Sequence, residues 1–396
     1  MNIVVTGTGI VSGIGMNVTE TIQSIATEKS GMGRITLFDS LHQGKAFVSE
    51  VKASNATLQE LLHIPSQQTY SRTTLLGIAA ARQAWEEAGL STSKHYRIGF
   101  ISGTSVGGMD LSEQFYQSYN QHPGKGKLRH IVSHDCGDST EKIAEHLGIQ
   151  DYISTISTAC SSAANSIMLG ARLLRSNLLD CVVAGGTDAL CRFTLNGFAS
   201  LKILDEQHCR PMDDSRAGLN LGEGAAYIVL ERSGEREVKA LANLASYANV
   251  CEAFHQTASS PEGEGPFLSM QKALQSANLQ AEAIDYINLH GTGTPNNDLA
   301  EGNAVKRLFG DKIPMLSSTK AFTGHTLGAA GGIEAVLSVL SIAQGIVYPN
   351  LNYQTPIREH GLVPATTYQT GINICNVLSN SFGFGGNNTT LIFSAS

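Results

Sequence analysis

The sequence predicts an α/β protein in which buried β-sheets alternate with layers of helices. Short apolar runs of strand length alternate along the chain with longer segments of helical periodicity. Some of these runs are apolar on both faces, which is typical of strands that helices cover on each side. Glycine supplies 41 of the 396 residues, which indicates many positions of close backbone approach or positive φ.

In the first half of the chain, the apolar runs lead into glycine or polar residues, and the segments between them carry small and apolar side chains at helical spacing. The predicted strands are Ile3–Val5, Arg97–Ser102, Asp180–Gly185 and Ala225–Leu230. The predicted helices are Thr73–Ala88 and Ser161–Arg175.

The second half repeats this alternation. Its predicted elements are the helices Pro266–Ala277 and Gly328–Gln344, the strand Tyr286–Leu289 and a hairpin over Ser379–Ser394. A glycine-rich segment at 222–226 precedes a strand, and a similar segment at 383–387 precedes another. This internal similarity predicts two related halves, 1–240 and 241–396.

Composition excludes several classes of protein. Hydrophobic residues make up 42% and charged residues 15%, which excludes a disordered chain. The net charge of −7 argues against a general role in binding nucleic acid or anionic membranes. The chain opens on a strand without a basic leader, and we find no apolar run of about 18 residues. We therefore expect a cytoplasmic protein with no membrane insertion.

The seven cysteines are odd in number and irregular in spacing, and no C-x-x-C occurs. We therefore expect neither a disulfide framework nor a metal site. Cys160 stands out because a strand-like run precedes it and a helix of small residues follows it. Amide groups and the positive dipole end at a helix N-terminus stabilise a thiolate. Taken alone, Cys160 is equally consistent with a buried structural cysteine.

Two histidines and a lysine occur in similar surroundings. His290 follows a strand and enters a loop of glycine and threonine, and His325 precedes a helix of small residues. Each histidine alone is consistent with a hydrogen-bonded loop residue, and Lys320 with a solvated lysine. Together with Cys160 they form a recognisable nucleophile set.

Two other motifs in the sequence point to different functions. The segment 103–107 matches the G-x-S-x-G nucleophile elbow of hydrolases with Ser105 as nucleophile, but Gly108 and Met109 make a poor start for the helix it needs. The segment 7–13 imitates a dinucleotide-binding fingerprint, but its third glycine is one residue late and the expected acidic residue is missing. We interpret 7–13 as a tight turn.

With Cys160, His290, Lys320 and His325 in this order, the chain resembles the β-ketoacyl-acyl-carrier-protein synthases, the elongating type II enzymes in particular. The resemblance extends from the Val4–Gly9 segment to the Asn380–Gly386 segment. It implies a thiolase-like fold of five layers, α-β-α-β-α, with two pseudo-symmetric halves. It also implies a homodimer, or a heterodimer with a synthase-like partner.

The resemblance implies an acyltransferase that joins malonyl-carrier to an acyl chain held on Cys160, with loss of CO2. His290 and His325 would donate hydrogen bonds to the enolate formed on decarboxylation, and which of them relays a proton stays open. The amides of Cys160 and Phe384 would hold the second oxyanion. Lys320 would orient His325.

The remaining implied site residues surround these groups. Asp298 and Glu334 would support the histidine loop and Lys320, and Phe384 would act as a gate with Gly383 and Gly385 in its hinge. The phosphopantetheine arm, which arrives on the acyl carrier protein, would bind at Thr292 and Thr294, and no other cofactor is expected. The acyl pocket would include Phe193, Phe198 and Met109, and Lys202 would dock the acidic carrier.

Some positions depart from the family pattern and keep alternatives open. Ala217 and Leu219 replace an aspartate and a phenylalanine, and Asn387 replaces a threonine. These departures favour a specialised polyene or polyketide pathway over general fatty-acid synthesis. The alternatives are a chain-length factor, a catalytic subunit that depends on one, and a thiolase. The intact nucleophile set argues against a chain-length factor. A thiolase would need a second catalytic cysteine near the C-terminus.

Overall fold

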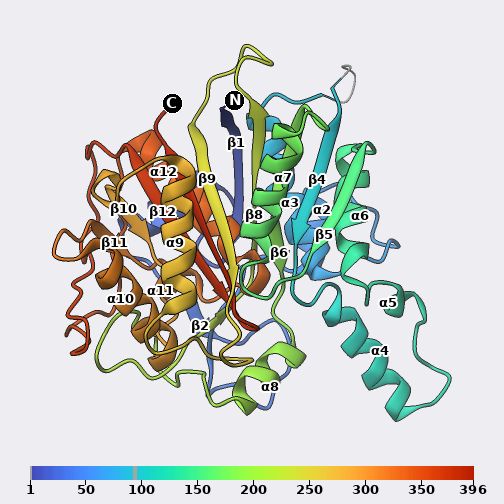
Figure 1. Cartoon of the computed structure of the whole chain (residues 1–396). Helices are drawn as coiled ribbons and strands as arrows, with labels where there is room; N and C mark the ends of the chain where they lie inside the picture. The colour runs from blue at the N-terminus through green and yellow to red at the C-terminus, as the bar shows by residue number, and fades with distance from the viewer. Residues whose placement is uncertain (1, 92–95) are drawn as a thin grey trace.

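The computed structural model describes residues 2–91 and 96–396, and its centre is one sheet of ten strands within these residues. Figure 1 shows the strands side by side, from β11 at one edge to β5 at the other. The first block, in sheet order, is β1 (Ile3–Ser12), β8 (Gly224–Arg232), β6 (Cys181–Asp188), β4 (Ile98–Gly103) and β5 (Tyr152–Ile156). The second is β9 (Ala242–Cys251), β13 (Asn387–Ser394), β12 (Asn376–Gly383), β10 (Tyr286–Asn288) and β11 (Met315–Ser317).

The two blocks repeat one pairing pattern. In each block the first two pairings are antiparallel and the last two are parallel. The blocks meet where Val4 pairs with Asn243 and Val5 with Ala242. The connection between the blocks, 233–241, contains the predicted boundary at 240. The division into domains 1–240 and 241–396 stays a prediction.

Helices complete five layers, as the family resemblance implied. Two helices pack against each other between the blocks, and the others cover the outer faces. The central pair is α7 (Ser162–Arg175) and α12 (Ala330–Gln344). The outer helices are α3 (Arg72–Glu87) and α6 (Cys136–Leu147) on the first block, and α9 (Glu264–Ala277) and α10 (Pro295–Phe309) on the second. The thiolase-like fold class is confirmed.

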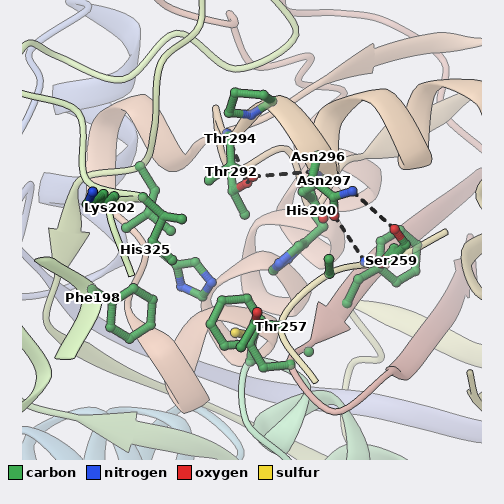
Figure 2. Close-up of a pocket in the computed structure, with 18 of the residues that line it drawn as sticks. Phe198, Lys202, Thr257, Ser259, His290, Thr292, Thr294, Asn296, Asn297 and His325 are labelled. Carbon is green, nitrogen blue, oxygen red and sulfur yellow. Dashed lines mark hydrogen bonds between the residues drawn. The ribbon is translucent and has the colours of Figure 1, made fainter. Parts of the chain in front are cut away.

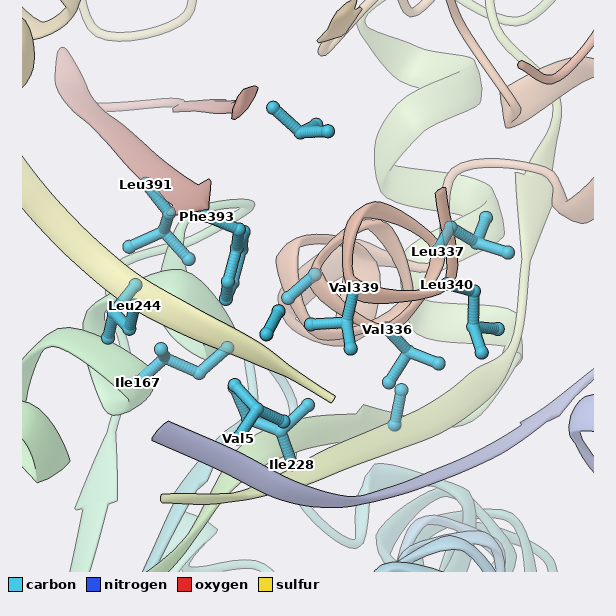
Figure 3. Packing of buried hydrophobic residues seen from close by; sticks show 14 of the residues in the cluster. Val5, Ile167, Ile228, Leu244, Val336, Leu337, Val339, Leu340, Leu391 and Phe393 are labelled. Carbon is cyan, nitrogen blue, oxygen red and sulfur yellow. The ribbon is translucent and has the colours of Figure 1, made fainter. Parts of the chain in front are cut away.

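The main core lies around the central helices and contains residues of both halves (Figure 3). Its members include Ile167 of α7, Val336 and Val339 of α12, Val5, Ile228, Leu244, Leu391 and Phe393. Contrary to our expectation, Leu327–Gln344 is long and apolar enough over 18 residues to cross a membrane by composition. Of this segment, 83% is buried inside the protein, so its apolar character belongs to a core helix. The cytoplasmic location stays a prediction.

The segment 7–13 is not a tight turn, because β1 runs through it to Ser12. Its glycines serve helix packing instead. A Cβ at Gly7 or Gly9 would overlap a carbonyl oxygen of α3, at Ala84 and Ala80 respectively. The absence of side chains therefore lets α3 lie directly against β1.

The other predicted elements occur with ends shifted by a few residues. The helix expected from Gly328, for example, begins as a 3₁₀ turn at Leu327–Ala329 and becomes α-helical at Ala330. Smaller elements surround the layers. They are α1 (Val18–Ala26), α2 (Asn55–Leu61), α4 (Met109–Gln121), α5 (Arg129–Val132), α8 (Arg192–Ser200), α11 (Lys320–Thr323), and a small sheet of β2 (Met32–Arg34), β3 (Phe47–Ser49) and β7 (Leu221–Gly222).

Candidate active site

Cys160 lies in a sharp turn between β5 and α7. Ala159 has a φ of +52°, an unusual conformation for a residue with a side chain. The Ser162 hydroxyl holds the turn, since it accepts a hydrogen bond from the Thr158 amide at 2.9 Å and donates to the Ala159 carbonyl at 2.6 Å. Cys160 precedes the Ser161 N-cap of α7 and is buried, with 5% of its surface exposed.

The position at the helix N-terminus does not produce a preformed thiolate. Burial raises the pKa of the Cys160 thiol to about 11, and the Phe384 amide and the Lys320 ammonium offset only part of this increase. Loss of water around the sulfur therefore opposes the stabilisation expected from the N-terminus of α7. The thiol is protonated near neutral pH, so its activation requires a proton acceptor in the site.

His290 follows β10 and is oriented by Lys320. The Lys320 ammonium lies 3.2 Å from His290 Nδ1 and also donates to the His290 carbonyl. Because an ammonium can only donate, Nδ1 is the acceptor and the imidazole proton lies on Nε2. Burial lowers the pKa of His290 well below 6.5, and the Lys320 charge lowers it further. His290 is a neutral hydrogen-bond donor.

His325 has the same tautomer for a different reason. Its Nδ1 accepts a hydrogen bond from the Leu327 amide at 3.1 Å, so its proton also lies on Nε2. Burial and the Lys320 charge lower its pKa well below 6.5. The two rings lie edge to face with centroids 5.3 Å apart, and Figure 2 shows them facing each other across the pocket. The site thus contains two neutral imidazoles with a donor each.

Lys320 itself is 2% exposed and is paired with the Glu334 carboxylate of α12. This corrects one implied role, because the lysine hydrogen-bonds to His290 and not to His325. Its charge still affects both rings, since it lowers both histidine pKa values. Glu334 supports Lys320 as the resemblance implied.

Two carboxylates on α10 hold the loop that follows His290. Asp298 accepts hydrogen bonds from the amides of Gly293 at 3.1 Å and Met212 at 2.7 Å. Glu301 accepts from the amides of His290 at 2.9 Å and Gly291 at 2.8 Å. Asp298 was predicted and Glu301 was missed. The available signal was their spacing, because residues three apart share one face of a helix.

The Phe384 loop covers the nucleophile. Phe384 is one of the groups that lower the pKa of the Cys160 thiol, through its backbone amide. Its ring stacks on Phe198 of α8, with centroids 5.9 Å apart. Gly385 and Gly386 have φ values of +83° and +78°, and a Cβ at Gly383 would crowd the Thr158 carbonyl at 2.9 Å. These glycines allow the loop to approach the nucleophile turn closely.

The reactive groups share one pocket with a volume of about 280 Å³. Of the predicted residues, Cys160, His290, His325, Phe384, Gly383, Thr292, Thr294, Phe198 and Lys202 line it. Thr292 and Thr294 lie 2.9 Å apart through their hydroxyl oxygens, and Thr294 also caps α10. Lys202 is exposed at the mouth. Polar residues that were not predicted, Thr257, Ser259, Asn296 and Asn297, complete the wall (Figure 2).

Three residues considered from the sequence do not line this pocket. Phe193 is 58% exposed on α8, and Met109 begins α4. Within this single chain, the predicted contribution of Phe193 and Met109 to the acyl pocket is therefore not found. The Ser105 hydroxyl donates to the Ala159 carbonyl at 3.4 Å, and among the described residues no histidine hydrogen-bonds to it. This arrangement does not fit the hydrolase alternative.

The donor atoms of Cys160, His290 and His325 all lie within 4.8 Å of one another. Nitrogen and sulfur donors in this number are also a ligand set that suits a soft divalent metal. The expectation that the site uses no metal stays a prediction. The seven cysteines are all described, and all are free.

Comparison with protein families identifies the chain. Residues 1–236 match the β-ketoacyl synthase N-terminal domain, and residues 241–354 match the C-terminal domain. The chain belongs to the β-ketoacyl synthase family. Among curated relatives, 3-oxoacyl-[acyl-carrier-protein] synthase 2 of Coxiella burnetii is 34% identical, and that of Staphylococcus aureus strain MRSA252 is 33% identical. Each alignment covers 99% of this chain and 98% of the relative.

Solved structures of other synthases have the same fold. The ishigamide ketosynthase/chain length factor superposes with a TM-score of 0.94 at 29% identity, covering 100% of this chain and 99% of that one. The ketosynthase ApeO in complex with its chain length factor ApeC from Xenorhabdus doucetiae gives 0.89 at 31% identity, covering 100% and 98%. A type II polyketide ketosynthase in complex with its acyl-carrier protein, AntDE:AntF, gives 0.87 at 26% identity, covering 100% and 99%.

Proposed function

We propose that the protein catalyses the decarboxylating condensation of a malonyl thioester with an acyl chain held on Cys160. The observation that carries this proposal is the pocket in which one thiol faces two neutral imidazole donors. An acyl acceptor and a separate hydrogen-bonding site for an enolate are the two functions that this reaction needs. The names of the curated relatives and the whole-chain family match support the same reaction class.

The first step transfers the acyl group. The Cys160 sulfur attacks the incoming thioester carbon, and the thiol proton is transferred to the pantetheine sulfur, which leaves as the thiol. The amides of Cys160 and Phe384, which both lower the pKa of the thiol through hydrogen bonds, are the proposed donors for the oxyanion that forms. The product is an acyl thioester on Cys160.

The second step uses the histidines as donors. The malonyl carboxylate leaves as CO2, and the electron pair remains as an enolate whose oxygen accepts hydrogen bonds from Nε2 of His290 and His325. The enolate carbon then attacks the acyl–Cys160 carbonyl and the Cys160 sulfur leaves. Neutral imidazoles suit this role, since they donate without protonating the carbanion. No cofactor beyond the carrier-bound pantetheine is expected.

The nucleophile is tested by mass spectrometry of the intact protein after incubation with hexanoyl-pantetheine. We expect a hexanoyl adduct on the wild-type protein and on Cys375→Ala, because Cys375 is exposed outside the pocket. Cys160→Ala should form none. An adduct on Cys160→Ala at the wild-type level would show that Cys160 is not the acyl acceptor.

The acyl carrier protein is proposed as the substrate donor, with Lys202 at the pocket mouth as a contact for its acidic surface. The complex of AntDE with its acyl-carrier protein supports such a partner for this fold. Lys202→Glu should weaken carrier binding while acylation by the small hexanoyl-pantetheine probe is retained. Equal affinity of both proteins for the carrier would remove Lys202 from the docking surface.

A second candidate is the catalytic subunit of a heterodimer with a synthase-like partner. The lobe of α4 and α5 stands away from the body in Figure 1, and it exposes Tyr116, Leu128 and Val132 by 65%, 76% and 66%. The strand β5 is an unpaired sheet edge beside it. Apolar exposure of this kind marks an interaction surface. The solved ketosynthases paired with chain length factors support a partner of synthase fold.

The mass of the purified protein in solution, measured by light scattering, distinguishes these assemblies. A mass near 84 kDa, about twice the 42.0 kDa chain, would support a homodimer. A monomer that becomes active only after co-expression with a synthase-like protein would support the heterodimer. A fully active monomer would contradict both.

A further inference from the structure

A cluster of polar side chains lies directly behind the nucleophile, outside the pocket. Its centre is Asn387, the first residue of β13 and the position where the family resemblance implies threonine. Asn387 Oδ1 lies within hydrogen-bond distance of three donors. These are the Ser161 hydroxyl at 2.8 Å, Asn165 Nδ2 at 2.8 Å and Asn249 Nδ2 at 2.6 Å.

The cluster joins segments that are far apart in the sequence. Ser161 directly follows the nucleophile, Asn165 lies one turn further along α7, and Asn249 comes from β9. Asn165 also donates to the Thr158 hydroxyl at 2.9 Å, at the start of the nucleophile turn. A threonine at 387 would place its oxygen one bond closer to the backbone than Asn387 Oδ1, whose donors come from two elements, α7 with its N-cap and β9.

Asn387 also defines one end of the Phe384 loop. It pairs with Gly383 across the loop and with Cys251 of β9. The loop glycines Gly383, Gly385 and Gly386 all precede Asn387 in the chain. The side chain therefore fastens the fixed end of the loop to the turn that carries Cys160.

We propose that Asn387 is a positioning residue that holds the Phe384 amide at the correct distance from the Cys160 amide. These amides are the oxyanion donors for acyl transfer in the proposed function, on which this inference rests. The enolate site is built differently, because Lys320, Glu301 and the Leu327 amide orient its histidines. Loss of Asn387 should therefore impair acyl transfer selectively.

The test compares four proteins with the wild type. Asn387→Ala removes the acceptor, Asn387→Asp retains it and adds a charge, and Ser161→Ala removes one donor. Asn243→Ala is the matched control, since Asn243 lies at the far end of β9 and its side chain, among the described contacts, hydrogen-bonds only to the Ala395 carbonyl. For each protein we would measure the rate of hexanoyl transfer from hexanoyl-pantetheine to Cys160, and the rate of malonyl-pantetheine decarboxylation.

Asn387→Ala should acylate at least about tenfold more slowly than wild type, because a small displacement of an oxyanion donor has a large effect on rate. Its decarboxylation rate should stay within about twofold. Asn387→Asp should recover part of the acylation rate with its pH profile shifted to higher pH, because a carboxylate raises the pKa of a nearby thiol. Ser161→Ala should show a smaller selective loss and Asn243→Ala none.

Two results would overturn the inference: acylation by Asn387→Ala within about twofold of wild type, or a parallel loss of both reactions. If Asn387→Ala does not fold, Asn387→Asp and Ser161→Ala decide the question by the same comparison of rates. A wild-type protein that forms no adduct on Cys160 would instead overturn the proposed function itself, and this inference with it.

Discussion

At the scale of single residues, the site depends on which proton each ring carries. Both histidines have Nδ1 occupied by a donor, one by the Lys320 ammonium and one by the Leu327 amide. Both therefore present Nε2–H, and their burial keeps them neutral. The sequence predicted a functional role for His290 and His325, but it could not show the separate groups that orient them.

The lowered histidine pKa values predict an unusual pH dependence of malonyl decarboxylation. From about pH 8 to about pH 6.5 the rate should stay constant, whereas an ordinary imidazole would be half protonated at about 6.5. The rate should fall only well below that pH, where the buried rings begin to protonate. A rate profile in buffers of constant ionic strength tests this, and loss of half the rate near pH 6.5 would contradict it.

The same shifts predict how stability depends on pH. Because each folded-state histidine pKa lies below the unfolded value of 6.5, the unfolded chain binds protons that the folded protein does not. These residues should therefore lower the free energy of unfolding as pH falls below about 6.5. Urea unfolding at several pH values measures the trend, and His325→Gln should show a weaker pH dependence than wild type in this range.

Glu301 is predicted to act through the histidine loop. In Glu301→Gln an amide replaces one carboxylate oxygen, so a donor faces the amide of His290 or Gly291. Decarboxylation should fall by about tenfold or more, while acylation of Cys160 changes less. Glu282→Gln is the control, since Glu282 is a largely exposed residue of the second half. Equal decarboxylation by Glu301→Gln and wild type would show that the loop does not need this carboxylate.

At the scale of elements, glycine determines how closely neighbouring elements approach. A Cβ at Gly185 of β6 would overlap the Ala226 carbonyl of the neighbouring strand β8. Gly197 of α8, in contrast, has open space where a Cβ would lie. The sequence showed that glycine was abundant but not which glycines are required, because the contacts come from elements distant in the chain.

These two glycines give opposite predictions for the same substitution. Gly185→Ala should destabilise the protein by more than about 1 kcal/mol, because backbone atoms would have to move. Gly197→Ala should stabilise it by about 0.5–1 kcal/mol, since alanine favours the helical backbone. Chemical denaturation of both variants measures the difference, and equal stabilities would contradict the assigned packing.

At the scale of the whole molecule, each half supplies part of the site and part of the core. Cys160 comes from the first half, and His290, His325 and Phe384 come from the second. Ile167 of α7 and Val336 of α12 belong to one buried cluster that spans both halves. The halves are related in pattern, but the protein is assembled around a shared interior.

This shared core predicts cooperative unfolding. Both blocks should unfold in one transition, because neither can keep its inner face covered without the other. Ile167→Ala should lower the free energy of unfolding by about 2–5 kcal/mol, whereas Leu41→Ala, at a position 90% exposed, should change it by less than about 0.5 kcal/mol. Calorimetry and circular dichroism would measure this, and two separated transitions would contradict the expectation.

The sequence by itself determined the α/β alternation and most elements to within a few residues, and it predicted the set of Cys160, His290, Lys320 and His325. These follow from local periodicity and from residue types in short motifs, which need no knowledge of distant contacts. The tertiary structure alone decided that Lys320 orients His290 and that burial raises the pKa of the Cys160 thiol. It also revealed Glu301 and the contacts of Asn387. Each of these findings depends on burial or on a partner far along the chain. Burial and distant partners cannot be predicted from the neighbouring residues in the sequence.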